Sequence, residues 1–224
     1  MSATRAVICF EDWFNRAQTY STTPGQNGWT IKDTSSSGTP TYANIDGGGC
    51  KLTLVSTSEA EIVTLYQNDR LAIPLLNLQN IRFNAVVAGI DSVTTLTMGV
   101  ASAQNDTDDS VATNAWFRME GSASTSAIVV ETDDGTTDNN DVATGASLST
   151  TYKEFMIDFS RGLSDIRFYI DGQPVATSTT FSMAAATSST YVQPWVQIQK
   201  ASGTGVPSVT IGHFKAEYTK TLGS

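Results

Sequence analysis

The 224-residue sequence contains one histidine, His213, and two cysteines, Cys9 and Cys50. Nucleophilic triads and histidine-based metal catalysis both need histidine, and neither GxSxG nor HExxH occurs. We therefore interpret His213 as a surface or strand-end residue and expect no triad or zinc hydrolase. The cysteines show no CxxC spacing, so we interpret them as a buried, reduced pair, with a disulfide as the alternative.

Positive charge is also scarce. The chain has 13 basic and 22 acidic residues, a net charge of −9, and basic residues that are scattered singly. Because phosphate binding needs clustered lysine and arginine, we expect no nucleic-acid partner.

Long hydrophobic runs are missing as well. Residues 6–10 form a short apolar run that Glu11 and Asp12 interrupt, which is too short for the core of a secretory signal. No other stretch approaches ~18 apolar residues. We expect a soluble polypeptide with no export signal and no membrane partner.

No helical periodicity persists over ten residues, and the region 184–186 offers the one plausible turn of helix. Short alternating segments separated by turns predict an all-β fold, a two-sheet antiparallel jelly-roll sandwich, formed as a single domain over 1–224. Besides a hairpin described below, the predicted strands are residues 7–10, 29–31, 50–56, 61–67, 81–90, 94–101, 115–120, 126–131, 175–179, 191–200 and 208–218.

Residues 71–78, LAIPLLNL, contain Pro74, which predicts an edge strand or a covering loop. The stretch carries more aliphatic side chains than an exposed edge should, so it is our first candidate for a subunit interface. A covering strand inside the domain is the alternative.

The clearest pattern lies in residues 152–177. Two alternating segments flank the turn SRGLSD, and Asp171-Gly172 supplies the positive-φ residues of a second tight turn. The residues expected on the buried face of this hairpin are Phe155, Ile157, Phe159, Ile166, Phe168 and Ile170.

The second half of the chain, from Tyr152 to Tyr218, resembles the closing strands of the concanavalin A-like (laminin G-like) jelly roll. The resemblance is carried by Phe155-x-Ile157-Asp158, Ile166-x-Phe168-Tyr169-Ile170-Asp171-Gly172-x-x-Val175, Pro194-x-Val196-x-Ile198-x-Lys200 and Val209-x-Ile211-x-x-Phe214-x-x-x-Tyr218. It implies a last strand that returns beside the first. That fold hosts lectins, glycoside hydrolases, lyases and non-enzymatic modules, including virion proteins of tailed bacteriophages. The whole chain looks most similar to the phage structural type.

Glycosidases of this fold carry carboxylates at E-x-D-x-x-E on one strand. The nearest match is Glu59-Ala60-Glu61-Ile62-Val63-Thr64, in which Thr64 replaces the last carboxylate. We interpret Glu59 and Glu61 as part of a solvated strand edge. We therefore expect no catalytic, cofactor-binding or metal-binding residues.

Two acidic loops and four tryptophans are the remaining candidates for a site. The loops, 105–110 and 133–147, could gather oxygen ligands around calcium, the one cofactor we consider, although solvated turns are the simpler interpretation. The acidic-loop residues are Asp106, Asp108, Asp109, Asp133, Asp134, Asp138, Asn139, Asn140 and Asp141. Trp13, Trp29, Trp116 and Trp195 could stack on sugar rings, but core or loop-anchoring roles are commoner.

These observations predict a non-enzymatic viral (phage) structural protein, such as a capsid decoration or other virion-surface component. It would act through contacts with capsid or other virion proteins, as a homo-oligomer, in the virion assembled in the host cytoplasm. The alternative is a carbohydrate-binding module or lectin, which would bind a glycan. A glycan hydrolase or lyase is the third hypothesis.

Overall fold

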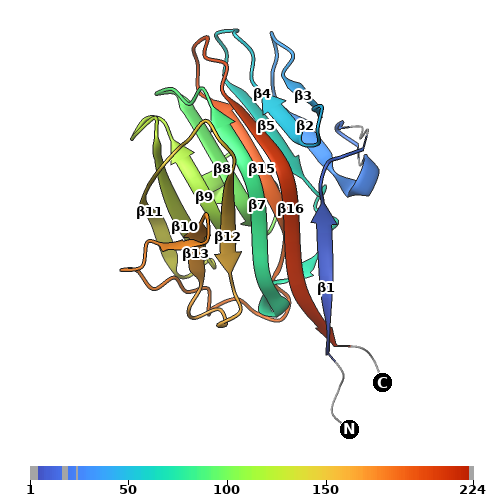
Figure 1. Ribbon diagram of the computed structural model, residues 1–224, viewed down its shortest axis with the longest axis vertical. Coiled ribbons are helices and arrows are strands. Elements are labelled where there is room, and N and C mark those ends of the chain that lie inside the picture. The colour runs from blue at the N-terminus through green and yellow to red at the C-terminus, as the bar shows by residue number, and fades with distance from the viewer. Residues whose placement is uncertain (1–4, 17–19, 24, 222–224) are drawn as a thin grey trace.

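A computed structural model describes residues 5–16, 20–23 and 25–221 as two antiparallel β-sheets packed face to face (Figure 1). Sheet A contains β1 (Arg5–Asp12), β3 (Thr41–Asn44), β4 (Cys50–Thr53), β7 (Leu78–Ala88), β12 (Lys153–Asp158), β13 (Arg167–Ile170), β14 (Gln173–Val175) and β16 (Ser208–Thr221). Sheet B contains β2 (Thr30–Asp33), β5 (Glu61–Tyr66), β6 (Ile73–Pro74), β8 (Thr94–Ala101), β9 (Asn114–Glu120), β10 (Ala127–Asp133), β11 (Asp138–Ser147) and β15 (Tyr191–Lys200).

The strand order in sheet A is β14-β13-β12-β7-β16-β4-β3, with β1 paired to β16, and in sheet B it is β11-β10-β9-β8-β15-β5-β2, with β6 paired to β15. The predicted all-β jelly-roll sandwich is confirmed. The return of the last strand beside the first is confirmed too, because every residue of β1 pairs with β16. The extent of the domain, 1–224, stays a prediction.

The core lies between the sheets, where alternate residues of each strand point inward. Phe117 of β9 contacts Phe155 and Phe168 of sheet A, with ring centroids 5.1 and 5.3 Å apart. The hairpin predicted over 152–177 forms as β12 and β13, and all six side chains expected on its buried face are buried. Edge-to-face aromatic pairs of this kind add about 0.5–1.5 kcal/mol each to their area burial.

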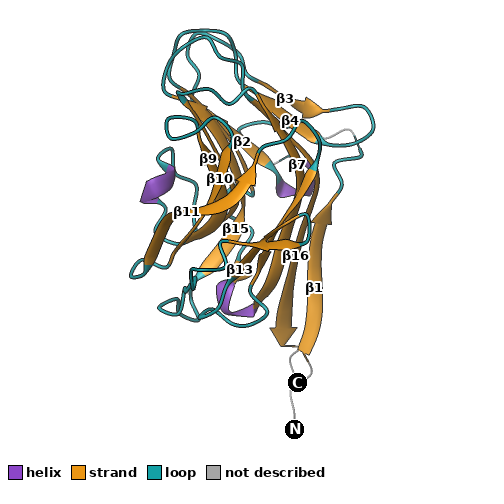
Figure 2. Ribbon diagram, turned by 60° about the vertical axis from the view of Figure 1, so that its left-hand side comes forward, coloured by secondary structure: helices purple, strands orange, loops and turns teal. Residues whose placement is uncertain are grey.

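Three segments differ from the sequence prediction. Residues 138–147, expected as part of an acidic loop, form the edge strand β11, because an edge strand with a solvated face needs few apolar residues. Residues 184–186 form no helix; the helical pieces of the described chain are 3₁₀ turns, η1 (Gln26–Gly28), η2 (Leu75–Asn77) and η3 (Asp108–Ser110), shown purple in Figure 2. The strand expected over 175–179 ends at Val175, and Ala176 follows with a positive φ of 52°.

The LAIPLLNL stretch is a covering segment that packs against the core of its own domain. Ile73, Leu75 and Leu78 are fully buried, and β6 pairs with β15. The expectation of a subunit interface is therefore wrong for Ile73, Leu75 and Leu78, because these side chains already pack in the core. Leu76 is the exception, because half of its surface is exposed.

The two cysteines are free and differ in environment. Cys50 is buried, and burial raises the pKa of its thiol to about 12, whereas Cys9 is exposed on β1. The expectation of a buried pair is thus correct for Cys50 and wrong for Cys9, because outward-facing positions alternate along β1. No helix among the described residues is long and apolar enough to cross a membrane.

Candidate functional site

The carboxylates of the E-x-D-x-x-E-like stretch do not form a catalytic pair. Glu59 accepts hydrogen bonds from the backbone of residues 36–38, and these bonds lower its pKa to about 2. Glu61 is fully buried, and its Oε2 lies 3.1 Å from Nζ of Lys200. The interpretation as a solvated edge is therefore wrong for Glu61, which faces the core and is neutralised there by an equally buried lysine.

Part of the two acidic loops does come together, around Arg118 of β9. Its guanidinium lies 2.6 Å from Asp109 and 3.6 Å from Asp108, Glu131 and Asp141. Asp106 pairs instead with Lys32 at 2.8 Å.

The other acidic-loop side chains mainly serve local turns. Asp133 accepts the Gly135 amide, and Asp134 accepts the amides of residues 136, 137 and 185. Asn140 donates to Asp138, and Asn139 donates to Thr132. Within the ranges that the structure describes, no cluster of three or more metal-ligating side chains is suitable for a metal ion.

The outer face of sheet B is closed by the loop of residues 102–113. Thr97 donates to Asp108 of this loop, and Gln197 donates to the Asp106 carbonyl. Beneath the loop, Trp116 and Trp195 stack with ring centroids 5.2 Å apart, and Val111 packs against them. Both indoles are completely buried, so they contribute to stability and are not accessible to a ligand.

Glu131 lies under the same cover, at 2% exposure. Burial raises its pKa to about 7, while Trp116 and Arg118 oppose that shift. A carboxyl group in this environment changes its protonation state near neutral pH.

The outer face of sheet A is open and contains a cavity of about 540 Å³, which we call the Trp13–Tyr152 pocket. Trp13 is 56% exposed and Tyr152 is 43% exposed, and both line the cavity. The complete lining is Glu11, Trp13, Gly47, Gly48, Arg82, Asn84, Tyr152, Glu154, Gly212, His213 and Lys215.

The end of β1 places Trp13 in this pocket. Outward and inward positions alternate along the strand, so Glu11 faces outward and Asp12 is buried. The Asp12 carboxylate accepts hydrogen bonds from the Phe14 amide and from Nε1 of Trp29, at 2.8 and 2.9 Å. Since Asp12 and buried Phe14 are fixed on either side, Trp13 is held outward.

The floor of the pocket is formed by an irregularity in β16. The pairing of β16 with β7 shifts between Ile211 and His213, which leaves Gly212 as an extra residue. A Cβ atom at Gly212 would lie 3.1 Å from Cε1 of Tyr152. The missing side chain therefore gives the Tyr152 ring its place against the strand.

Polar groups on β7 and β12 complete the pocket. Nη1 of Arg82 lies 3.8 Å from Glu154, which is too far for a hydrogen bond, and Nε of Arg82 has no hydrogen-bond partner among the described residues. Asn84 adds an amide that can both donate and accept. The pocket thus combines exposed aromatic side chains with the polar groups of Arg82, Asn84 and Glu154 in its lining.

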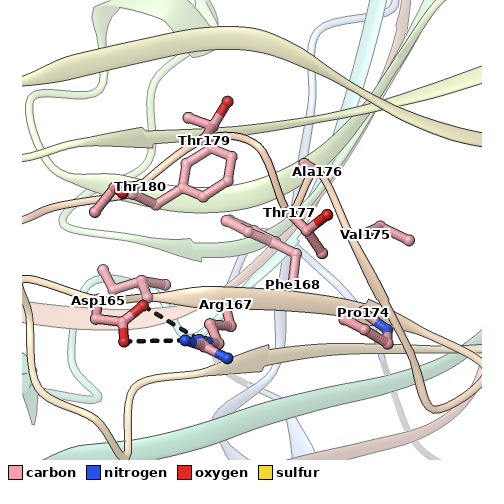
Figure 3. A pocket seen from close by; sticks show the side chains of 11 residues that line it. Asp165, Arg167, Phe168, Pro174, Val175, Ala176, Thr177, Thr179 and Thr180 are labelled. Atoms are coloured by element: carbon pink, nitrogen blue, oxygen red, sulfur yellow. Dashed lines mark hydrogen bonds and ion pairs between the residues drawn. The ribbon is translucent and has the colours of Figure 1, made fainter.

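A second cavity, of about 170 Å³, lies beside β13 and β14 (Figure 3). Its charged groups are already paired, because Asp165 binds Arg167 at 3.2 Å and Arg161 at 2.6 Å. Phe168 and Phe181, which also line it, are buried against each other. This cavity offers less to a ligand than the Trp13–Tyr152 pocket.

The core interpretation of the tryptophans is confirmed for Trp29, Trp116 and Trp195 and is wrong for Trp13. The sequence held a signal for this difference. Trp13 continues the outward parity of Val7, Cys9 and Glu11 beyond the end of β1. His213 lies within β16, next to the irregularity, and not at a strand end.

The fold is a two-sheet jelly roll like that of solved concanavalin A-like proteins. No protein-family model and no curated protein matches the sequence. Among solved structures, the β-glucanase of Bacillus licheniformis is similar, with 14% identity, a TM-score of 0.62, and coverage of 93% of this chain and 97% of that one.

Two further structures extend the comparison. The catalytic domain of an endo-1,3-β-glucanase (laminarinase) from Thermotoga petrophila has 9% identity, a TM-score of 0.62, and coverage of 98% of this chain and 100% of that one. The Emp47p carbohydrate recognition domain has 10% identity, a TM-score of 0.56, and coverage of 94% of both chains. At these identities the likeness establishes the fold alone.

The comparisons correct the prediction that the chain is not an enzyme. That prediction took the missing motif as grounds to exclude glycan chemistry, whereas glycoside hydrolases such as the laminarinase share the fold over nearly the whole chain. The exclusion of an enzyme is therefore withdrawn. The likeness to virion proteins of phages stays a prediction.

Proposed function

We propose that the protein binds carbohydrate in the Trp13–Tyr152 pocket. The observation that carries this proposal is the pairing of two exposed aromatic rings with a polar floor in one open cavity of about 540 Å³. Sugar rings present an apolar face of C–H groups and a rim of hydroxyls, so they suit an aromatic surface bordered by donors and acceptors. The shared fold with glucanases and a carbohydrate recognition domain supports the proposal.

The aromatic and polar residues of the pocket would contact different parts of a sugar. The free face of Trp13 and the ring of Tyr152 would pack against sugar C–H groups, and Arg82, Asn84 and Glu154 would bond to hydroxyls. Each contact is modest, since aromatic packing of this kind contributes about 0.5–1.5 kcal/mol beyond area burial.

The test is a glycan array followed by calorimetry on the best ligand, with Trp13→Ala as the variant. We expect the variant to bind about tenfold or more weakly, which corresponds to about 1.4 kcal/mol. Tyr191→Ala is the matched control, because Tyr191 is 45% exposed and does not line the pocket. Equal affinity of Trp13→Ala and wild type for every bound glycan would refute this site.

Two additional experiments on the same samples test for turnover and for calcium dependence. A reducing-sugar assay on each bound glycan measures turnover, which separates a hydrolase from a lectin. Calorimetry with a chelator, and then with added calcium, tests the calcium hypothesis, and an unchanged affinity in both would retire it.

The virion role is kept as a separate proposal: a particle-associated protein, assembled in the host cytoplasm, that contacts capsid or other virion proteins as a homo-oligomer. The exposed side chains of Leu76 and Tyr191 support it, because they lie on the adjoining segments η2 and β15. Light scattering tests this proposal. A monomer whose mass is unchanged by Leu76→Ser and Tyr191→Ser would count against self-association there.

A further inference from the structure

Three side chains of the Trp13–Tyr152 pocket form one connected unit, which we call the Glu11–His213–Trp13 stack. The imidazole of His213 lies parallel to the indole of Trp13, with ring centroids 3.9 Å apart and planes inclined by 27°. On its other side, Nε2 of His213 lies 2.9 Å from Oε1 of Glu11. A carboxylate from β1 and an imidazole from β16 thus support the tryptophan that the proposed function uses.

His213, the middle group of the stack, is the least exposed of the three, and Trp13 is the most exposed. The His213 side chain is 16% exposed and the Glu11 side chain 36%, whereas Trp13 is 56% exposed. One face of the indole is therefore covered by the imidazole, and the indole retains a large accessible surface. A ring held in this way loses little conformational freedom when a ligand binds, which favours affinity.

The charge environment supports the same arrangement. The pKa of Glu11 is lowered, first by the hydrogen bond from His213, with a smaller contribution from a hydrogen bond of the Trp13 side chain. The carboxylate thus holds both rings.

The other groups around His213 come from three neighbouring elements. Asn84 and Arg82 lie on β7, Glu154 lies on β12, and Tyr152 precedes β12. Lys215 lies on β16 itself and is paired with Glu217 at 2.8 Å, and Arg82 faces Glu154. Glu11 is thus the carboxylate in direct contact with His213.

We propose that Glu11 and His213 are positioning residues that hold Trp13 as a preorganised sugar-binding platform, and that glycan affinity depends on the hydrogen bond between them. The inference rests on the proposed function of the pocket. It adds a regulatory property to that function, namely a pH window for binding.

The direction of the pH effect follows from the chemistry of the stack. A protonated His213 forms an ion pair with Glu11 and places a cation on the face of Trp13, which strengthens the support. Affinity should fall about two- to fivefold when the imidazole loses its proton at higher pH. On the acid side, protonation of Glu11 removes the ion pair, so affinity should fall again; because the pKa of Glu11 is lowered, this loss comes at a more acidic pH than for an ordinary glutamate.

The experiment is calorimetry with the best ligand from the glycan array at pH values from 3.5 to 8.5, on full-length wild type and three variants. His213→Phe keeps a ring beneath Trp13 and cannot titrate, so it should bind with a flat profile across the histidine range. Glu11→Gln should lose the acid limb and bind about two- to fivefold more weakly at pH 5.5. Glu120→Gln is the control, because Glu120 lies on β9 of sheet B and does not line the pocket, and it should retain the wild-type profile.

A second measurement does not depend on the ligand. Trp13 emission, obtained as the difference between wild type and Trp13→Phe, should change with pH through the histidine range and should lose that change in His213→Phe. Thermal unfolding of each variant verifies that it is folded.

The outcomes separate the two claims. If Trp13→Ala loses binding while His213→Phe and Glu11→Gln keep the wild-type affinity and pH profile, the proposed function stands and the inference is refuted. If wild type binds no glycan, the proposed function fails and the affinity claim falls with it. A Trp13 emission that does not depend on pH would refute the coupling in either case.

Discussion

The outer faces of the two sheets both carry aromatic side chains above a glycine, but these side chains are buried on sheet B and exposed on sheet A. On sheet B, Gly99 of β8 is in register with Trp116 on one side and Trp195 on the other, and the two indoles stack. On sheet A, Gly212 of β16 lies beneath Tyr152, and Trp13 stacks on His213. Trp116 and Trp195 are fully buried under residues 102–113, whereas Trp13 and Tyr152 are exposed in an open cavity.

The difference shows that aromatic content alone does not identify a binding face. On sheet B the covering loop removes the indoles from water and converts them into core, with Arg118 and its carboxylates closing the edge. On sheet A the aromatic rings retain accessible surface, so a ligand that covers them gains the free energy of burying that surface. The comparison predicts stability effects on one face and binding effects on the other.

The largest expected difference is between two tryptophan truncations. Trp116→Ala should lower the free energy of unfolding by about 3–5 kcal/mol, because it opens a cavity in packed core. Trp13→Ala should change it by less than about 1 kcal/mol, since most of that side chain faces solvent. Urea denaturation followed by circular dichroism measures both, and similar losses for the two variants would break the comparison.

The arginines of the two faces give the next contrast. Arg118→Met should cost about 3–5 kcal/mol at pH 7, because Asp108 and Glu131 would remain buried without their cation. Arg82→Met should lie within about 0.5 kcal/mol of wild type, because the Arg82 side chain is 39% exposed and its ion pair is long. The same denaturation experiment decides, and a neutral Arg118→Met would show that the cluster is better solvated than its burial indicates.

Much of the fold could be predicted from the sequence because its signals are local. The hairpin of β12 and β13 was predictable from alternating aromatic and aliphatic residues, and the turn after it from Asp171-Gly172. β11 was not predictable in this way, because an edge strand of polar residues has the composition of a loop. Its partner β10 determines its structure.

The candidate site was harder to predict because it depends on contacts between distant segments. The sequence singled out Trp13 and His213, but their stacking requires β1 to pair with β16, about 200 positions later, in one register. The sequence did not predict Tyr152 as a pocket residue, because the position of its ring depends on an irregularity at Gly212 that composition does not reveal. The burial of Trp116 and Trp195 likewise depends on where residues 102–113 fold.

The buried carboxyl of sheet B should give the protein a pH-dependent stability. The pKa of Glu131 rises from 4.5 to about 7 on folding, chiefly through burial, so the folded state binds this proton more tightly than the unfolded state. The resulting stabilisation is present below about pH 4.5 and is lost as pH rises through about 7, a change of roughly 3 kcal/mol.

Glu131→Gln isolates that contribution because an amide stays neutral. The difference in unfolding free energy between variant and wild type should shift in favour of the variant as pH rises from 5 to 8, by roughly 2.5 kcal/mol. Chemical denaturation at four pH values measures it. A constant difference would mean that Glu131 has the same pKa in the folded and unfolded chain.

The smallest expected effect concerns the glycines beneath the aromatic rings. A Cβ at Gly99 would lie 2.2 Å from the Ala115 carbonyl oxygen, whereas at Gly212 the nearest atom would be Cε1 of Tyr152 at 3.1 Å. Because the half-exposed Tyr152 ring can turn away and a buried backbone cannot, Gly212→Ala should change unfolding free energy by less than about 1 kcal/mol. Its effect should instead be a few-fold loss of glycan affinity in calorimetry, since the displaced ring no longer borders the pocket. If Gly212→Ala destabilises the protein strongly and leaves binding unchanged, the open face of sheet A is structural in the same sense as the covered face of sheet B.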